Sequence, residues 1–165
     1  IPEKDELWIT DGKKLWLEKR DGSQKIINIS KNKELHQMTL VSSKNHRNEP
    51  LERLIERIDF KKVVTIGSVG CKIASILRGE SDIYISLSIP GKSCPKDWDF
   101  AAPEAILKAA GGAMTTLNNN DLIYCKNNFE QGGIIVASNN SETHESKCMQ
   151  IKQIIKKFNL FPIDC

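Results

Sequence analysis

One stretch decides the fold of this chain: Pro95-Lys-Asp-Trp-Asp-Phe-Ala-Ala-Pro-Glu-Ala-Ile-Leu-Lys-Ala-Ala-Gly-Gly-Ala-Met114. It predicts a single helix with both ends marked. The carboxylate of Asp97 or Asp99 can cap the N-terminus by accepting from free backbone N–H groups. Pro103 is tolerated only near a helix start, because it has no N–H and fixes φ. Gly111-Gly112 then ends the helix, since glycine adopts the left-handed turn without a steric penalty.

The inward face of this helix is predicted to be a narrow stripe of small apolar residues, which permits close packing: Ala102, Ala105, Ile106 and Ala109. The last helix is predicted to be capped by Ser141. The residues of that helix predicted to face inward are Met149, Ile151, Ile154, Ile155 and Phe158.

Strands and helices alternate on both sides of this stretch. Apolar, β-branched runs predict strands, and apolar residues at helical spacing predict helices. The predicted strands are 38–43, 62–66, 82–87, 113–117 and 134–137, and the further helices begin near 50, 70 and 142. Such alternation is typical of a layered α/β domain, which we place at residues 38–165.

Residues 1–37 have a different pattern. Asp11-Gly12 and Asp21-Gly22 are tight-turn signals between short apolar runs, so this segment predicts a three-stranded β-meander. Three short strands bury little surface alone and need a partner sheet or helix. We therefore expect 1–37 to be the edge of a larger domain.

Composition excludes several classes of protein. The 165 residues are 39% hydrophobic and 27% charged, as in ordinary soluble domains. A net charge of +3 does not demand a nucleic-acid polymer or a membrane, and no apolar run is long enough for a transmembrane segment. The five cysteines are scattered without Cys-x-x-Cys spacing, which argues against zinc and disulfides and favours a cytoplasmic location.

Candidate ligand residues follow three of the predicted elements. In α/β sheets, ligands gather beyond the carboxyl ends of strands and at helix N-termini. Ser43–His46 and Gly67–Lys72 are typical of anion sites, because they combine hydroxyl, imidazole and ammonium groups with a glycine-rich turn. Trp98-Asp99 is typical of a cation site. His36 and His144 have no such neighbours and are predicted to lie on the surface.

The pattern Trp98-Asp99-x-x-Ala102-x-x-x-Ile106-Leu107-x-x-x-Gly111-Gly112 resembles a signature of the inositol-monophosphatase-like superfamily of magnesium-dependent phosphatases. The resemblance implies that Asp99 is a Mg²⁺ ligand and contacts substrate. It also implies the sugar-phosphatase fold, with residues 38–165 as the C-terminal layered α/β domain and 1–37 as a remnant of the first domain.

Together the three segments resemble one branch, the 3′(2′),5′-bisphosphate nucleotidases, which act on 3′-phosphoadenosine 5′-phosphate (PAP) in sulfur assimilation and nucleotide recycling. That resemblance implies that Ser43, His46, Ser68 and Lys72 contact the adenosine 5′-phosphate part of this small-molecule substrate. Lys44 and Asn45 depart from the branch pattern, which has Arg and Ser there.

The family's remaining metal ligands lie in a Glu-Glu segment and an Asp-Pro-Ile/Leu-Asp-Gly-Thr motif, and this sequence contains neither. The catalytic residues therefore stay unknown, and we expect the chain to be the C-terminal part of a longer phosphatase, inactive alone. Three alternatives stay open: an inositol or sugar phosphate phosphatase, a non-catalytic nucleotide-binding domain, and an α/β domain without a site. An exposed edge in 1–35 also predicts self-association.

Overall fold

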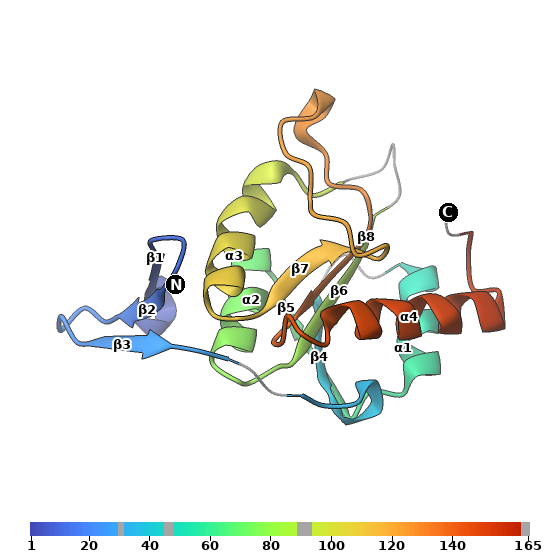
Figure 1. The fold of residues 1–165 in the computed structure, drawn as a ribbon, viewed down its shortest axis with the longest axis horizontal. Coiled ribbons are helices and arrows are strands. Elements are labelled where there is room, and N and C mark those ends of the chain that lie inside the picture. Colours follow the sequence, from blue (N-terminus) through green and yellow to red (C-terminus); the bar gives the residue numbers. More distant parts are fainter. Residues whose placement is uncertain (30–31, 45–47, 89–93, 163–165) are drawn as a thin grey trace.

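The computed structural model describes residues 1–29, 32–44, 48–88 and 94–162, and arranges their strands in two sheets (Figure 1). The smaller sheet is the predicted meander, antiparallel in the order β1-β2-β3. Its strands are β1 (Leu7–Thr10), β2 (Leu15–Glu18) and β3 (Gln24–Ile27), and a short 3₁₀ helix, η1 (Pro2–Lys4), precedes them.

The larger sheet has the strand order β5-β4-β6-β8-β7. Its strands are β4 (Thr39–Ser43), β5 (Lys62–Ile66), β6 (Ile83–Ser88), β7 (Ala113–Thr116) and β8 (Gly133–Ser138). β4 runs parallel to both β5 and β6, whereas β8 is antiparallel to β6 and β7. The carboxyl ends of β4, β5 and β6 therefore meet at one edge of the sheet.

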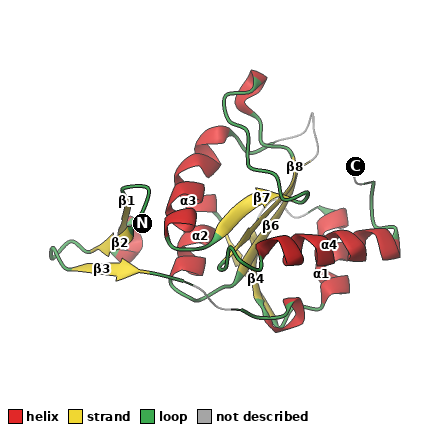
Figure 2. Cartoon of the chain, viewed as in Figure 1, coloured by secondary structure: helices red, strands yellow, loops and turns green. Residues whose placement is uncertain are grey.

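Four helices cover this sheet (Figure 2). They are α1 (Glu49–Ile58), α2 (Val69–Leu77), α3 (Asp97–Ala109) and α4 (His144–Phe158), with short 3₁₀ helices η2 (Leu35–Gln37) and η3 (Asn127–Phe129) between them. α1 and α4 lie on one face with one apolar core, and α2 and α3 lie on the other face with a second core (Figure 1). The predicted layered α/β architecture is confirmed. None of the helices described is long and apolar enough to cross a membrane.

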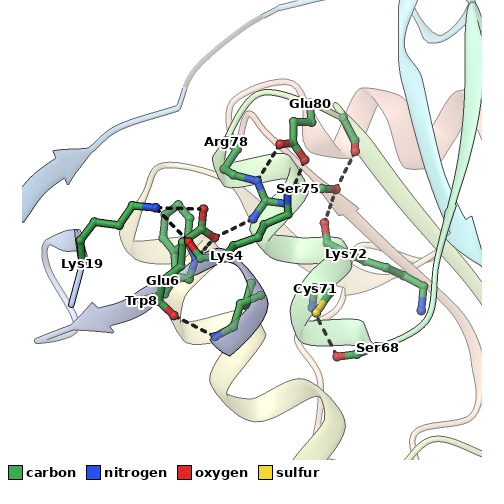
Figure 3. A network of polar contacts seen from close by, with 12 residues as sticks. Lys4, Glu6, Trp8, Lys19, Ser68, Cys71, Lys72, Ser75, Arg78 and Glu80 are labelled. Atoms are coloured by element: carbon green, nitrogen blue, oxygen red, sulfur yellow. Dashed lines mark hydrogen bonds and ion pairs between the residues drawn. The ribbon is translucent and has the colours of Figure 1, made fainter. Parts of the chain in front are cut away.

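The meander is attached to the layer formed by α2 and α3. Leu15 is fully buried in the core beneath these helices. Figure 3 shows the polar part of the joint, in which Glu6 accepts a 2.8 Å hydrogen bond from Arg78 and a 3.1 Å bond from the Trp8 indole. Arg78 also binds both carboxylate oxygens of Glu80 at 2.8 Å. One buried carboxylate thus ties β1 to the C-terminal end of α2.

The first turn and the buried face of α3 differ from the prediction. Lys96, rather than Asp97 or Asp99, is the N-cap residue, and Asp99 accepts a 2.8 Å bond from its backbone N–H. Pro103 lies in the helix interior rather than near the start. The buried residues of α3 are Asp97, Phe100, Pro103, Glu104 and Leu107. The predicted stripe is only partly correct: Ala102 and Ala105 are exposed, whereas Ile106 and Ala109 are half-buried and pack against the core.

The predicted cap and inward face of α4 were also partly wrong. Thr143 is the N-cap residue instead of Ser141, and the Asn140 side chain accepts from the backbone of Glu142 and Thr143. The buried face consists of His144, Lys147, Cys148, Ile151 and Ile155. Met149 is exposed because it falls outside the i, i+4, i+7, i+11 row that faces the sheet, and Phe158, the last residue of the helix, is also exposed.

Candidate functional site

Two of the predicted segments meet at the edge where β4 and β5 end. Ser43, the last residue of β4, pairs with Ile66, the last residue of β5, so the Gly67–Ser68 turn begins beside Ser43. β6 lies along the other side of β4, with Tyr84 opposite Val41. The parallel pairing therefore brings Ser43 and the α2 N-terminus together, which agrees with the expectation that ligand residues gather beyond the carboxyl ends of strands.

Ser68 is the N-cap residue of α2, and its hydroxyl accepts a 3.3 Å bond from the Cys71 backbone N–H (Figure 3). The residue is exposed, so the hydroxyl and the free N–H groups of the first turn face solvent. This end of α2 combines partial positive charge with small side chains, which is the environment that favours an anion.

Lys72 does not extend into solvent. Its side chain is 1% exposed, and the ammonium group donates a 2.7 Å bond back to the Gly67 carbonyl. Burial lowers the pKa of Lys72 to about 8, whereas the neighbouring Cys71 and Asp99 act in the opposite direction. In this conformation Lys72 holds the turn and adds positive charge beneath it.

Asp99 is exposed on the first turn of α3, one residue after the exposed Trp98. One carboxylate oxygen is engaged by the Lys96 backbone. The charge of Asp99 acts on both Lys72 and the Tyr84 phenol, so it shares an electrostatic environment with the α2 end of the site. The two halves of the predicted site are thus neighbours across α2 and α3.

Tyr84 is a member of this cluster that sequence reasoning missed. Its ring lies beneath the Lys72 ammonium, 5.3 Å from the ring centroid, and its phenol faces Ser86 and Ser43. Burial is the main reason that the pKa of Tyr84 is raised. The only signal in the sequence is a tyrosine within a strand-forming run, and most such residues are core aromatics.

The predicted histidines have different outcomes. His46 lies outside the described residues, so its predicted role stays a prediction. His36 is exposed, as expected. His144 is not a surface residue, because it is 2% exposed between the Ser138 and Thr115 hydroxyls, at 2.7 Å and 2.8 Å. The surface prediction failed because the hydroxyls come from two strands, β8 and β7, that surround the imidazole only after folding.

The loop after β7 is tied to the start of α3. Asp97 is buried and accepts 2.6 Å bonds from the Cys125 backbone and the Gln131 side chain. Phe129, in the same loop, packs against Trp98 with ring centroids 6.0 Å apart. Asp97 is therefore a structural anchor, which leaves Asp99 as the carboxylate that faces solvent at this end of α3.

Residues 2–156 match a known family, described as the inositol monophosphatase family. The chain belongs to the inositol monophosphatase family. Solved structures show a similar fold. An inositol monophosphatase of Thermotoga maritima superposes on 87% of this chain with a TM-score of 0.60 and 18% identity, over 53% of its own length. The inositol monophosphatase of Anabaena superposes with a TM-score of 0.59 and 23% identity, over 85% of this chain and 54% of its own length.

Curated relatives within this family include bisphosphate nucleotidases. The 3′(2′),5′-bisphosphate nucleotidase 1 of Rattus norvegicus is 32% identical over 110 residues, which are 66% of this chain and 34% of that protein. The nucleotidase CysQ of Buchnera aphidicola is 35% identical over 109 residues, 66% of this chain and 38% of that protein. The matched segment therefore spans little more than a third of these relatives. Inositol monophosphatase 3 of Xenopus tropicalis matches at 29% over 60% of the chain.

Members of the inositol monophosphatase family generally use metal ions. Within the described ranges, no group of three His, Cys, Asp or Glu side chains is arranged to hold one. Asp99 provides a single exposed carboxylate, and one carboxylate with water binds Mg²⁺ weakly. The described residues therefore do not form a complete metal centre.

Proposed function

We propose that the complete protein is a phosphatase that hydrolyses the 3′-phosphate of PAP, giving AMP and phosphate. The observation that carries this proposal is the match of two thirds of the chain to bisphosphate nucleotidases at 32% and 35% identity. The cluster at the ends of β4 and β5 supports it, because a solvent-facing helix N-terminus beside Ser43 suits a phosphate group.

In this proposal Ser43, His46 and Ser68 contact the 5′-phosphate side of the nucleotide. Lys72 contributes its charge from beneath the turn, or contacts the phosphate after its side chain reorients. Asp99 is a ligand of a Mg²⁺ ion that other residues complete. We further propose that residues 1–37 and 38–165 are two structural units, that the protein is cytoplasmic, and that residues 1–165 alone bind nucleotide without hydrolysing it.

Calorimetric titration of this chain with AMP and with PAP, each with and without Mg²⁺, tests the proposal. We expect both nucleotides to bind without metal, because the anion site is built from backbone N–H groups, hydroxyls and Lys72. Ser43→Ala should weaken AMP binding by about threefold, the effect of losing one neutral hydrogen bond. The matched control is Ser23→Ala, an exposed serine in a meander turn.

Inositol 1-phosphate is the ligand that tests the alternative substrate class, since an inositol monophosphatase is among the relatives. Binding of inositol phosphate in preference to AMP would replace the nucleotide assignment with the inositol assignment. Absence of binding to every ligand would overturn the proposed anion site in this chain. If the purified chain released phosphate from PAP in the presence of Mg²⁺, only the proposal that residues 1–165 are inactive alone would be contradicted.

The meander is proposed to cause self-association. Among the described residues β1 and β3 each pair only with β2, and their apolar side chains Leu7 and Ile26 are 55% and 73% exposed. Unpaired strand edges of this kind recruit other chains. We expect sedimentation velocity to show concentration-dependent oligomers that Ile26→Lys reduces and Lys13→Ser does not. A purely monomeric profile at high concentration would contradict the prediction.

A further inference from the structure

We propose that Tyr84 is a positioning residue of the anion site, holding the Lys72 ammonium over its ring and orienting the Ser43 hydroxyl with its phenol. The inference rests on the proposed function, because it assigns Tyr84 a role in receiving the phosphate group of that ligand. It adds a residue that no sequence pattern singled out.

The position of Tyr84 allows one side chain to contact both α2 and the end of β4. β6 lies next to β4, and Tyr84 belongs to the apolar core under α2 and α3. The side chain is 1% exposed, so its surroundings hold it in one place. Its ring meets Lys72 of α2, and its phenol meets Ser43 at the end of β4.

The Lys72 ammonium needs this support because it is buried. An ammonium group removed from water is unfavourable unless other groups compensate its charge. The Gly67 carbonyl at 2.7 Å and the Tyr84 ring at 5.3 Å provide two such compensations. Asp99 of α3 and Cys71 of α2 are the titratable neighbours that also act on Lys72. Lys72 in turn fixes the Gly67 carbonyl, which orients the turn whose N–H groups face solvent.

The phenol has a separate effect on Ser43. A serine hydroxyl has one proton and two acceptor lone pairs, and it rotates to suit its partners. A buried phenol beside it restricts that rotation, so the hydroxyl presents one fixed donor or acceptor at the site. The ring and the hydroxyl of Tyr84 therefore make contributions that two different substitutions can separate.

The test uses Tyr84→Phe and Tyr84→Leu, each in the native chain and in a Lys72→Met background, with AMP and inorganic phosphate as calorimetric ligands. We expect Tyr84→Leu to weaken both ligands about tenfold, equivalent to about 1.4 kcal/mol. Tyr84→Phe keeps the ring and should lose only about threefold. In the Lys72→Met background, Tyr84→Leu should lose less than threefold, because the ammonium it supports is gone.

A ligand-free NMR measurement completes the test. Protons near an aromatic ring face are shifted upfield, so the Lys72 ε-methylene signal should be upfield in the native chain and in Tyr84→Phe, and normal in Tyr84→Leu. Equal losses for Tyr84→Leu with and without Lys72 would overturn the inference and leave Tyr84 a core residue. If phosphate binds but AMP does not, the proposed nucleotide function is wrong. The phosphate affinities of the Tyr84 variants then decide whether Tyr84 is a positioning residue. If the native chain binds neither, both proposals fall.

Discussion

Gly112→Ala lowers the free energy of unfolding by about 3 kcal/mol, at the upper end of the usual effect of overpacking a core. A Cβ atom at Gly112 would lie 2.6 Å from the Ser138 carbonyl oxygen and 2.7 Å from a Leu107 methyl carbon. The carbonyl belongs to β8, where Ser138 pairs with Ala113, so it cannot move without disturbing the sheet. The chain turns from α3 into β7 at this point, and only glycine allows the close approach.

Urea unfolding followed by circular dichroism measures this effect. Gly132→Ala is the matched control, because a Cβ there would meet only the Cys94 sulfur at 3.9 Å, an ordinary contact. The control should change stability by less than 1 kcal/mol. A Gly112→Ala protein as stable as the control would show that the turn between α3 and β7 relaxes freely.

Acidification between pH 6.5 and pH 4 destabilises the fold through His144, by up to about 3 kcal/mol. Burial lowers the pKa of His144 to about 4, whereas an unfolded histidine has a pKa near 6.5. In that window the unfolded chain binds a proton that the folded chain excludes, so stability falls as the pH falls. Above pH 6.5 both states are neutral at this residue and the effect is absent.

The hydrogen bonds around His144 are consistent with a neutral ring. The Thr115 hydroxyl donates to the Thr116 carbonyl at 2.8 Å, so it accepts from the Nε2–H of His144. The Ser138 hydroxyl lies 2.7 Å from the other ring nitrogen, Nδ1, and 3.3 Å from the Asn140 carbonyl, so with a neutral ring it can donate to Nδ1. If Nδ1 were protonated, that hydroxyl could donate to the Asn140 carbonyl instead, so burial of the charge remains the cause of the lowered pKa.

Urea unfolding at pH 7.5 and at pH 4.5 measures how much free energy of unfolding the native chain and His144→Gln each lose on acidification. Carboxylates contribute equally to both proteins, so the difference between the losses belongs to His144 and should be about 2 to 3 kcal/mol. His36→Gln is the control, because His36 is exposed, and it should keep the native loss. Equal losses in all three proteins would contradict the prediction.

Most of the strand pattern could be predicted from the sequence because apolar runs, several of them β-branched, lie next to turn residues such as Asp11-Gly12, Asp21-Gly22 and Gly132-Gly133. The position of the candidate site could be predicted from that pattern, because ligands in α/β sheets gather beyond the carboxyl ends of strands. The pairing of Ser43 with Ile66 agrees, since it brings Ser43 beside the Gly67 turn.

The buried faces of α3 and α4 could not be predicted, because polar residues occupy them. Glu104 is buried through bonds to Tyr124 and Lys108, and His144 through bonds to Ser138 and Thr115. Lys108 lies on α3 itself, but Tyr124, Ser138 and Thr115 lie outside the helix whose residue they contact. Helical periodicity alone therefore assigns Glu104 and His144 to the surface. The same holds for Tyr84, whose role depends on two side chains that neighbour it only after folding.

Helix α2 links two parts of the molecule that the sequence separates. Its first turn belongs to the proposed anion site, and Arg78, just beyond its last turn, binds Glu6, which precedes β1 of the meander. A helix of this length spans about 14 Å and is stiff along its axis. A displacement of the meander at Glu6 would therefore be transmitted along α2 to the N–H groups of its first turn.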